Sequence, residues 1–194
     1  MSTLRRDDYE AIVALVTPGA RVLDLGCGDG SLLEVLVARR QATVRGVEIA
    51  EPDVRACIAK GLPVRHGNIE EGLADYDDQK FDFVVLSQTL AFLNRPEPVV
   101  REMLRVGRQA VISFDNAGHW RDRWRALRGD GAGATLVSGA PRERSITLPQ
   151  FRAFAVRLGA LIDQTIYLNT IGRIHCCPAW RARTAVCLVR KAGA

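Results

Sequence analysis

The sequence has no apolar run that approaches the ~20 residues a membrane-spanning helix requires. Its opening residues, Met-Ser-Thr-Leu-Arg-Arg-Asp-Asp, also lack the apolar stretch of a secretory signal peptide. We therefore expect a cytoplasmic protein of bacterial type with no membrane partner.

Cysteine is sparse and has no metal-binding spacing. The five cysteines include no Cys-x-x-Cys pair, and their number is odd. We therefore expect structural or incidental roles for all five and predict no metal and no disulfide framework: Cys27, Cys57, Cys176, Cys177 and Cys187.

The length of 194 residues and the 47% apolar content are enough for one substantial core but not for two ordinary domains. We predict a single domain over residues 1–194.

The most informative stretch present is Val22–Gly30, Val-Leu-Asp-Leu-Gly-Cys-Gly-Asp-Gly. Its apolar start predicts a buried strand, and a helical pattern begins at Ser31. Glycines at alternate positions between them, Gly26, Gly28 and Gly30, predict a sharp turn that a ligand can approach closely. A strand, a glycine turn and a helix together form the first half of a nucleotide-binding βαβ unit.

The glycine spacing separates two classes of ligand. A dinucleotide fingerprint would place its third glycine at position 31, where this chain has Ser31. The pattern Asp-x-Gly-x-Gly-x-Gly instead resembles motif I of class I S-adenosylmethionine (SAM)-dependent methyltransferases. That resemblance implies that Asp24 lies near the ammonium group of SAM and that Cys27 lies within the cofactor loop. A tight turn without a ligand is the alternative.

Two later positions extend the predicted cofactor site. Glu48 ends a second predicted strand, twenty positions after Gly28, where a carboxylate can accept hydrogen bonds from both ribose hydroxyls. Ile49 follows it. Asn68 and Ile69 follow a third apolar run, at the point that meets adenine in methyltransferases, and an amide can pair with the adenine edge. A solvated helix start for Glu48 and a simple turn for Asn68 are the alternatives.

The remaining apolar runs predict a Rossmann-like α/β fold. With those above, they give seven strands, helices on both faces, and an antiparallel pair at the C-terminal edge of a mostly parallel sheet. The later strands are predicted at 81–86, 109–114, 165–168 and 184–189, with helices at 96–106 and 148–158.

Charge divides the chain in two. Residues 1–100 carry a net charge of −5 (11 basic, 16 acidic), and residues 101–194 carry +10 (16 basic, 6 acidic). Arginines alternate with tryptophans over 119–128, a pattern that fits partner or substrate contact, a solvated helix or, less readily, nucleic acid. We expect an insertion over about 116–147 to form a lid or docking surface.

Several stretches together resemble the methionine biosynthesis protein MetW family. The more specific ones are Phe81-Asp-Phe-Val-Val-Leu-Ser-Gln-Thr-Leu90 and Ser113-Phe-Asp-Asn-Ala-Gly-His-Trp-Arg121. The resemblance runs from about residue 21 to 125. It implies a methyltransferase fold, a role in methionine biosynthesis and a homoserine O-acyltransferase as partner. The chain departs from the family over 139–148, where members usually have Trp-Tyr-Asp-Thr-Pro-Asn-Ile-His. Whether it keeps the partner surface of the family is therefore open.

Catalytic residues are harder to assign. The Asn/Asp-Pro-Pro-Tyr signature of amino methyltransferases is missing after the fourth predicted strand. His119 is the candidate general base, and orienting the insertion is its alternative role. Ser87, Gln88 and Thr89 are expected on the wall that faces the methyl group. Two functions stay open: a SAM-binding accessory protein, and a methyltransferase of a small acceptor, with an anionic acceptor as one option.

Overall fold

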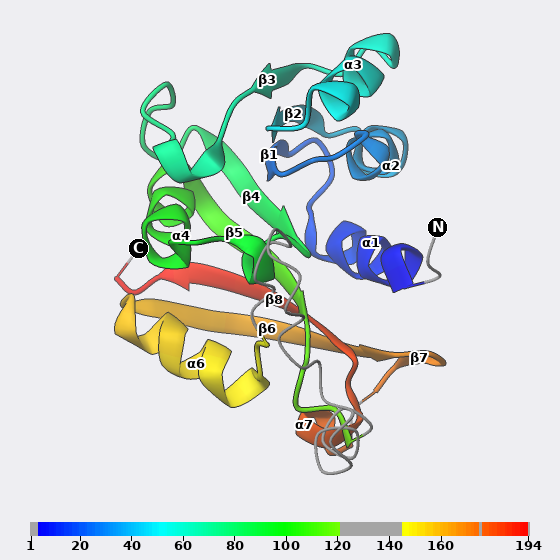
Figure 1. Ribbon diagram of the computed structural model, residues 1–194, viewed down its shortest axis with the longest axis vertical. Helices are drawn as coiled ribbons and strands as arrows, with labels where there is room; N and C mark the ends of the chain where they lie inside the picture. The colour runs from blue at the N-terminus through cyan, green and yellow to red at the C-terminus, as the bar shows by residue number, and fades with distance from the viewer. Residues whose placement is uncertain (1–3, 121–144, 175, 194) are drawn as a thin grey trace, which may run out of the picture.

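The computed structural model describes residues 4–120, 145–174 and 176–193 (Figure 1). The arginine- and tryptophan-rich stretch and most of the predicted insertion, residues 121–144, lie outside the described residues. Among the described helices, none is both long enough and apolar enough to cross a membrane.

The chain alternates helices and strands through its first half. The elements are α1 (Leu4–Leu15), β1 (Arg21–Leu25), α2 (Ser31–Arg40), β2 (Thr43–Glu48), α3 (Glu51–Ala59), β3 (Val64–His66), the 3-10 helix η1 (Ile69–Glu71) and β4 (Phe81–Ser87). The second half continues with η2 (Leu90–Phe92), α4 (Pro96–Val106), β5 (Gly107–Asp115), α6 (Leu148–Arg157), β6 (Ala160–Asn169), β7 (Gly172–Arg173), α7 (Pro178–Arg181) and β8 (Thr184–Lys191).

The strands form one sheet in the order β3-β2-β1-β4-β5-β8-β6-β7. Strands β1 to β5 are parallel, and β8, β6 and β7 add antiparallel pairings. The strand order reverses between β1 and β4, which neighbour each other in the sheet. In such sheets ligands bind at the carboxyl ends of the strands beside this reversal.

Helices cover both faces of the sheet (Figure 1). Residues of α1 and α2, with Cys57 of α3, pack in one hydrophobic cluster against one face, and residues of α4 and α6 pack in a second cluster against the other. Neighbouring residues of one strand serve both clusters: Val22 belongs to the first and Leu23 to the second. This double burial is why the central strands are nearly continuous apolar runs.

The structure corrects the predicted strand number. The described residues form eight strands rather than seven, because the short strand β7 pairs with the end of β6. The predicted antiparallel pair, β6 and β8, is present, but β8 lies between β5 and β6, and β7 forms the edge. The segment between that pair also carries a helix, the four-residue α7. Runs this short carry too little periodicity to be detected from sequence.

The sequence patterns also overlooked α1, which matters for the site. Its apolar stripe includes Ile12 and continues to Val16, the residue just after the helix, and both are buried. One turn earlier the stripe continues with a charged residue, Asp8, which is also fully buried. A carboxyl group on the buried stripe of a helix breaks the amphipathic pattern, and that break is itself a signal of a functional position.

Candidate functional site

The glycine turn after β1 has the backbone that its sequence predicted. Gly26 and Gly28 have φ angles of +74° and +53°, a region that side chains disfavour. A Cβ atom at Gly26 would lie 2.9 Å from the Thr89 hydroxyl, whereas one at Gly28 would meet nothing within 4 Å. The turn is thus packed on one side against the end of β4 and open above Gly28, where a ligand can approach the backbone.

Glu48 lies at the end of β2, beside this turn, and is nearly buried. Its Oε2 accepts a hydrogen bond from the Gly28 amide (2.9 Å), and its Oε1 accepts from the amides of Ile49 and Ala50 (2.8 Å each). These bonds fix the carboxylate. Oε1 accepts two of them, whereas Oε2 accepts one and retains a further lone pair. The geometry leaves Glu48 able to accept from a ligand hydroxyl.

The residues predicted near adenine differ in exposure. Ile49 is 62% exposed, an unusual state for a large apolar side chain next to a buried carboxylate. Ile69 is buried in the core, and the Asn68 Oδ1 accepts a hydrogen bond from the Glu70 amide (2.9 Å), so it caps η1. The amide nitrogen of Asn68 is the part that a hydrogen bond to adenine would use.

A small polar cavity of about 30 Å³ lies at the reversal between β1 and β4. It is lined by Tyr9, Asp24, Gly26, Cys27, Asp29, Leu32, Ser87 and Gln88. The turn, β1 and β4 therefore meet here as predicted, and α1 adds Tyr9. A volume this small suits a compact polar group, roughly the size of one or two waters.

Asp24 supplies the charge of this cavity. It is 1% exposed, and its Oδ1 has no hydrogen-bond partner. Burial, together with the nearby carboxylates of Asp8 and Glu48, raises its pKa to about 7. A buried carboxylate with an unpaired oxygen is costly unless a donor or a cation meets it. This feature indicates a positively charged ligand group.

The end of β4 contributes strained backbone as well as side chains. Gln88 has a φ of +55°, which is unusual for a residue with a side chain. Its amide donates to the hydroxyl of Ser113 on β5 (3.1 Å), and the Ser87 hydroxyl donates to Asp8 (2.7 Å). The neighbouring strands and α1 thus hold this turn against the cavity.

The glycine loop also carries a buried thiol. The Cys27 sulfur lies 4.0 Å from the sulfur of Cys57, and burial raises the pKa of Cys27 well above its usual range. A thiol that stays protonated is a poor nucleophile, so Cys27 acts as a small packing residue. Gly30 follows at a φ of +79° and precedes α2, whose first residue Ser31 donates from its amide and hydroxyl to Asp29.

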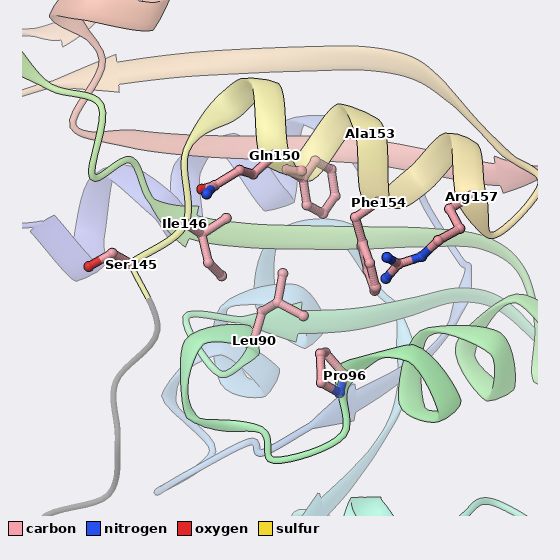
Figure 2. Close-up of a pocket in the computed structure, with 9 residues that line it drawn as sticks. Leu90, Pro96, Ser145, Ile146, Gln150, Ala153, Phe154 and Arg157 are labelled. Atoms are coloured by element: carbon pink, nitrogen blue, oxygen red, sulfur yellow. The ribbon is translucent and has the colours of Figure 1, made fainter.

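A second, larger cavity of about 730 Å³ lies between α6 and the segment from η2 to α4 (Figure 2). In Figure 2, Leu90 and Ile146 point toward one another, and Phe154 and Arg157 extend from α6 toward the side of Pro96. Among the described residues, the lining is mainly apolar: Leu90, Pro96, Ser145, Ile146, Gln150, Phe151, Ala153, Phe154 and Arg157. Such a cavity suits an apolar ligand body.

His119, the predicted base, lies in the turn after β5 and is buried. Asn116 organises this turn: its Nδ2 donates to the carbonyls of Ala179 and Ala182, and its Oδ1 accepts from the Gly118 amide. The histidine ring packs 5.8 Å from that of Trp120. His119 is not among the residues that line either cavity.

Comparisons with known proteins agree with this geometry. The family model of methionine biosynthesis protein MetW matches residues 6–188. The bifunctional methionine biosynthesis protein MetXA/MetW of Rhodopirellula baltica is 30% identical over 174 residues, which cover 82% of this chain and 28% of that protein. A ubiquinone biosynthesis O-methyltransferase of Hahella chejuensis is 35% identical over 120 residues, covering 59% of this chain and 49% of that enzyme. The chain thus spans less than half the length of each relative.

Solved structures resemble the fold closely at low identity. A SAM-dependent methyltransferase from Archaeoglobus fulgidus has a TM-score of 0.73 at 16% identity, covering 97% of this chain and 93% of that chain. A possible histamine N-methyltransferase from Thermotoga maritima has a TM-score of 0.71 at 17% identity, covering 97% and 89%. These likenesses confirm the expected class I methyltransferase fold.

Proposed function

The chain belongs to the methionine biosynthesis protein MetW family, and from that premise we propose that it binds SAM and S-adenosylhomocysteine (SAH) at the carboxyl ends of β1 and β2. The observation that carries the proposal is Asp24, a buried residue that lines the polar cavity beside the glycine turn and whose Oδ1 has no hydrogen-bond partner. A cationic amino group is the partner such an oxygen requires, and SAM and SAH both carry one.

Each part of the site has a distinct role in this proposal. Glu48 would accept from the ribose hydroxyls while Gly28, Ile49 and Ala50 hold its carboxylate in place. The exposed side chain of Ile49 would cover one face of adenine, and Asn68 would meet its edge. When bound, SAM supplies a methyl group on a sulfonium. The residues of the chain position that group and exclude water from it.

Isothermal titration calorimetry with SAM and SAH tests this proposal. Replacing Glu48 with alanine should weaken binding by about 1–3 kcal/mol, because it removes the acceptor from a buried polar contact. Glu51→Ala is the matched control, since Glu51 is an exposed carboxylate three residues later that pairs with Arg55. Failure of folded wild-type protein to bind either compound would end the proposal.

The biological role that we favour is that of an accessory protein in methionine biosynthesis, acting with a homoserine O-acyltransferase. The relative from Rhodopirellula baltica supports this role, because its name joins a MetXA part and a MetW part in one protein. The buried position of His119 outside both cavities gives no support to a base and so also favours an accessory role.

A docking surface for that partner is available at the carboxyl end of β5. Trp120 and Trp180 are about half exposed there, and the bonds from Asn116 to the carbonyls of Ala179 and Ala182 hold their two segments together. Tryptophan is among the residues that dominate interface energies. The arginines at 121, 123 and 125, which were predicted to contact a partner or substrate, follow Trp120 in the sequence but lie outside the described residues.

Co-purification with a homoserine O-acyltransferase tests this role. We expect Trp180→Ala to weaken capture about tenfold or more, the scale of a lost interface anchor. Val156→Ala is the control, because Val156 is an exposed apolar residue of α6, away from α7. If no acyltransferase associates with wild type, with or without SAM, the accessory role is wrong.

A methyltransferase of a small acceptor is the second candidate function. One observation favours it: the turn after β4 places Gln88 on the polar cavity and Leu90 on the apolar one. An acceptor in the apolar cavity would thus lie beside the cofactor, with Arg157 available for an anionic group. Transfer of labelled methyl groups from SAM to candidate acceptors tests it.

His119 remains the proposed base for that activity. Once an acceptor is found, His119→Ala should lower turnover by about 10²–10⁴-fold without changing SAM affinity. Equal turnover in variant and wild type would reject the role.

A further inference from the structure

Asp8 of α1 is a carboxyl group that the proposed cofactor contacts do not use. It is fully buried, and its Oδ2 accepts hydrogen bonds from the hydroxyls of Ser87 on β4 (2.7 Å) and Ser113 on β5 (2.8 Å). Its Oδ1 has no partner. Asp8 thus joins α1 to the ends of the two strands beside the polar cavity, and half of its acceptor capacity is unmet.

Asp8 and Asp24 share one electrostatic environment. Their mutual repulsion adds to the effect of burial on Asp24. The charged and titratable groups that act on the pair are themselves acidic: Glu48 on β2 and Asp115 on β5. Nearby, Tyr9 and Asp29 line the cavity, and the Cys27 thiol is protonated. Two buried carboxyls with an unpaired oxygen each therefore act on one another beside the polar cavity.

We infer that Asp8 acts with Asp24 as a carboxyl pair that selects ligands by their positive charge, and that the pair favours SAM over SAH. This inference rests on the proposed function. The two compounds share an amino group, but only SAM carries a sulfonium charge. The long-range attraction of a second carboxylate acts on that extra charge. Asp8 is a positioning residue here, since Asp24, and not Asp8, lines the cavity.

Ligand binding at this carboxyl pair is coupled to the release of a proton. Burial raises the pKa of Asp8 to about 6 against the opposing bonds from Ser87 and Ser113, and the pKa of Asp24 is about 7. Near pH 6.5 the pair without ligand therefore holds about one proton. A cation favours the charged form of both carboxyls, so binding expels that proton. The affinity for SAM, and its margin over SAH, should rise as the pH rises from 5.5 to 7.5.

Calorimetry at pH 6.5 in two buffers of different ionisation enthalpy counts the released protons. Wild type should release about one proton per SAM and fewer per SAH. Asp8→Asn removes the charge while keeping an acceptor for the two serine hydroxyls. It should roughly halve the proton count and reduce the SAM-to-SAH affinity ratio about tenfold, whereas a purely structural role would weaken both ligands equally.

Asp115→Asn is the matched control, because Asp115 is an exposed carboxylate on β5 whose influence on Asp8 is the weakest of those described. It should change both readouts far less than Asp8→Asn does. The inference is overturned if wild type binds SAM without proton release, or if Asp115→Asn acts as Asp8→Asn does. If Asp8→Asn fails to fold, the number of protons that the wild type releases on binding SAM tests the inference by itself. Absence of any SAM binding would instead remove the proposed function itself.

Discussion

The cavity beside Asp24 is small and polar, whereas the cavity beneath α6 is about 730 Å³ and mainly apolar. The first is built from the turn after β1, the end of β4 and α1, with Glu48 of β2 bonded to the same turn. The second is built from η2, the start of α4 and one side of α6. The polar cavity has fixed hydrogen bonds and a lining carboxyl, Asp24, with an unpaired oxygen, whereas the described lining of the apolar one has ring surfaces and the guanidinium of Arg157.

This difference separates two kinds of specificity. Unpaired buried oxygens reject any ligand that cannot pair with them, so the polar cavity is selective by charge. Apolar walls discriminate weakly between ligands of similar shape, so the larger cavity accommodates variation. In the proposed function, the polar cavity therefore determines the cofactor and the apolar cavity the acceptor. Three substitutions test this contrast.

The largest effect is expected at the glycine turn. Gly28→Val would put a branched side chain into the open space above the turn, and SAM affinity should fall by about 100-fold or more, equivalent to about 3 kcal/mol. Gly19→Val is the control, since Gly19 has a similar φ of +73° and open space around it, and it precedes β1, at the opposite end of that strand from the turn. Calorimetry on both variants separates loss of the site from backbone strain. Similar affinities would show that the ligand does not approach Gly28.

Asp24→Asn should show that the polar cavity is built at the expense of stability. The pKa of Asp24 is raised in the folded protein, so folding favours its protonated form, and the wild type loses stability as the pH rises toward and through 7. The asparagine variant does not titrate. The free energy of unfolding of Asp24→Asn minus that of the wild type should therefore increase by on the order of 2 kcal/mol from pH 5 to pH 8. Denaturant unfolding without ligand measures it, and a difference independent of pH would contradict the burial account.

The smallest effect is expected at the apolar cavity. Ala153→Trp should fill space beneath α6 yet change SAM affinity by less than about twofold, because the residue lies on the other cavity. Val156→Trp, on the same helix but outside the lining, controls for the added ring. Any methyl-acceptor activity should fall only in the first variant. A large loss of SAM affinity would show that the two cavities form one cofactor site.

The sequence predicted the strands, turn and helix around the glycine motif well because their signals are local. The glycine spacing at 26, 28 and 30 requires a turn, and apolar runs before it and before Glu48 require buried strands. The helix at 96–106 was predicted with its observed bounds, since Pro96 opens it and an apolar stripe runs through it.

What the sequence did not reveal depends on long-range packing. Asp8 contacts residues more than seventy positions away, and only the folded sheet brings Ser87 and Ser113 to it. The apolar cavity likewise joins η2 to α6. The roles assigned to His119 and Asn68 remain predictions. Asp8 alone had a detectable signal, as an acidic residue on the apolar stripe of a helix.

A crystal structure with SAH bound tests the central claim most directly. We expect the amino group of SAH beside Asp24, its ribose hydroxyls on Glu48 and its adenine against Ile49. Density for SAH in the cavity beneath α6, or contacts that bypass both Asp24 and Glu48, would contradict the account.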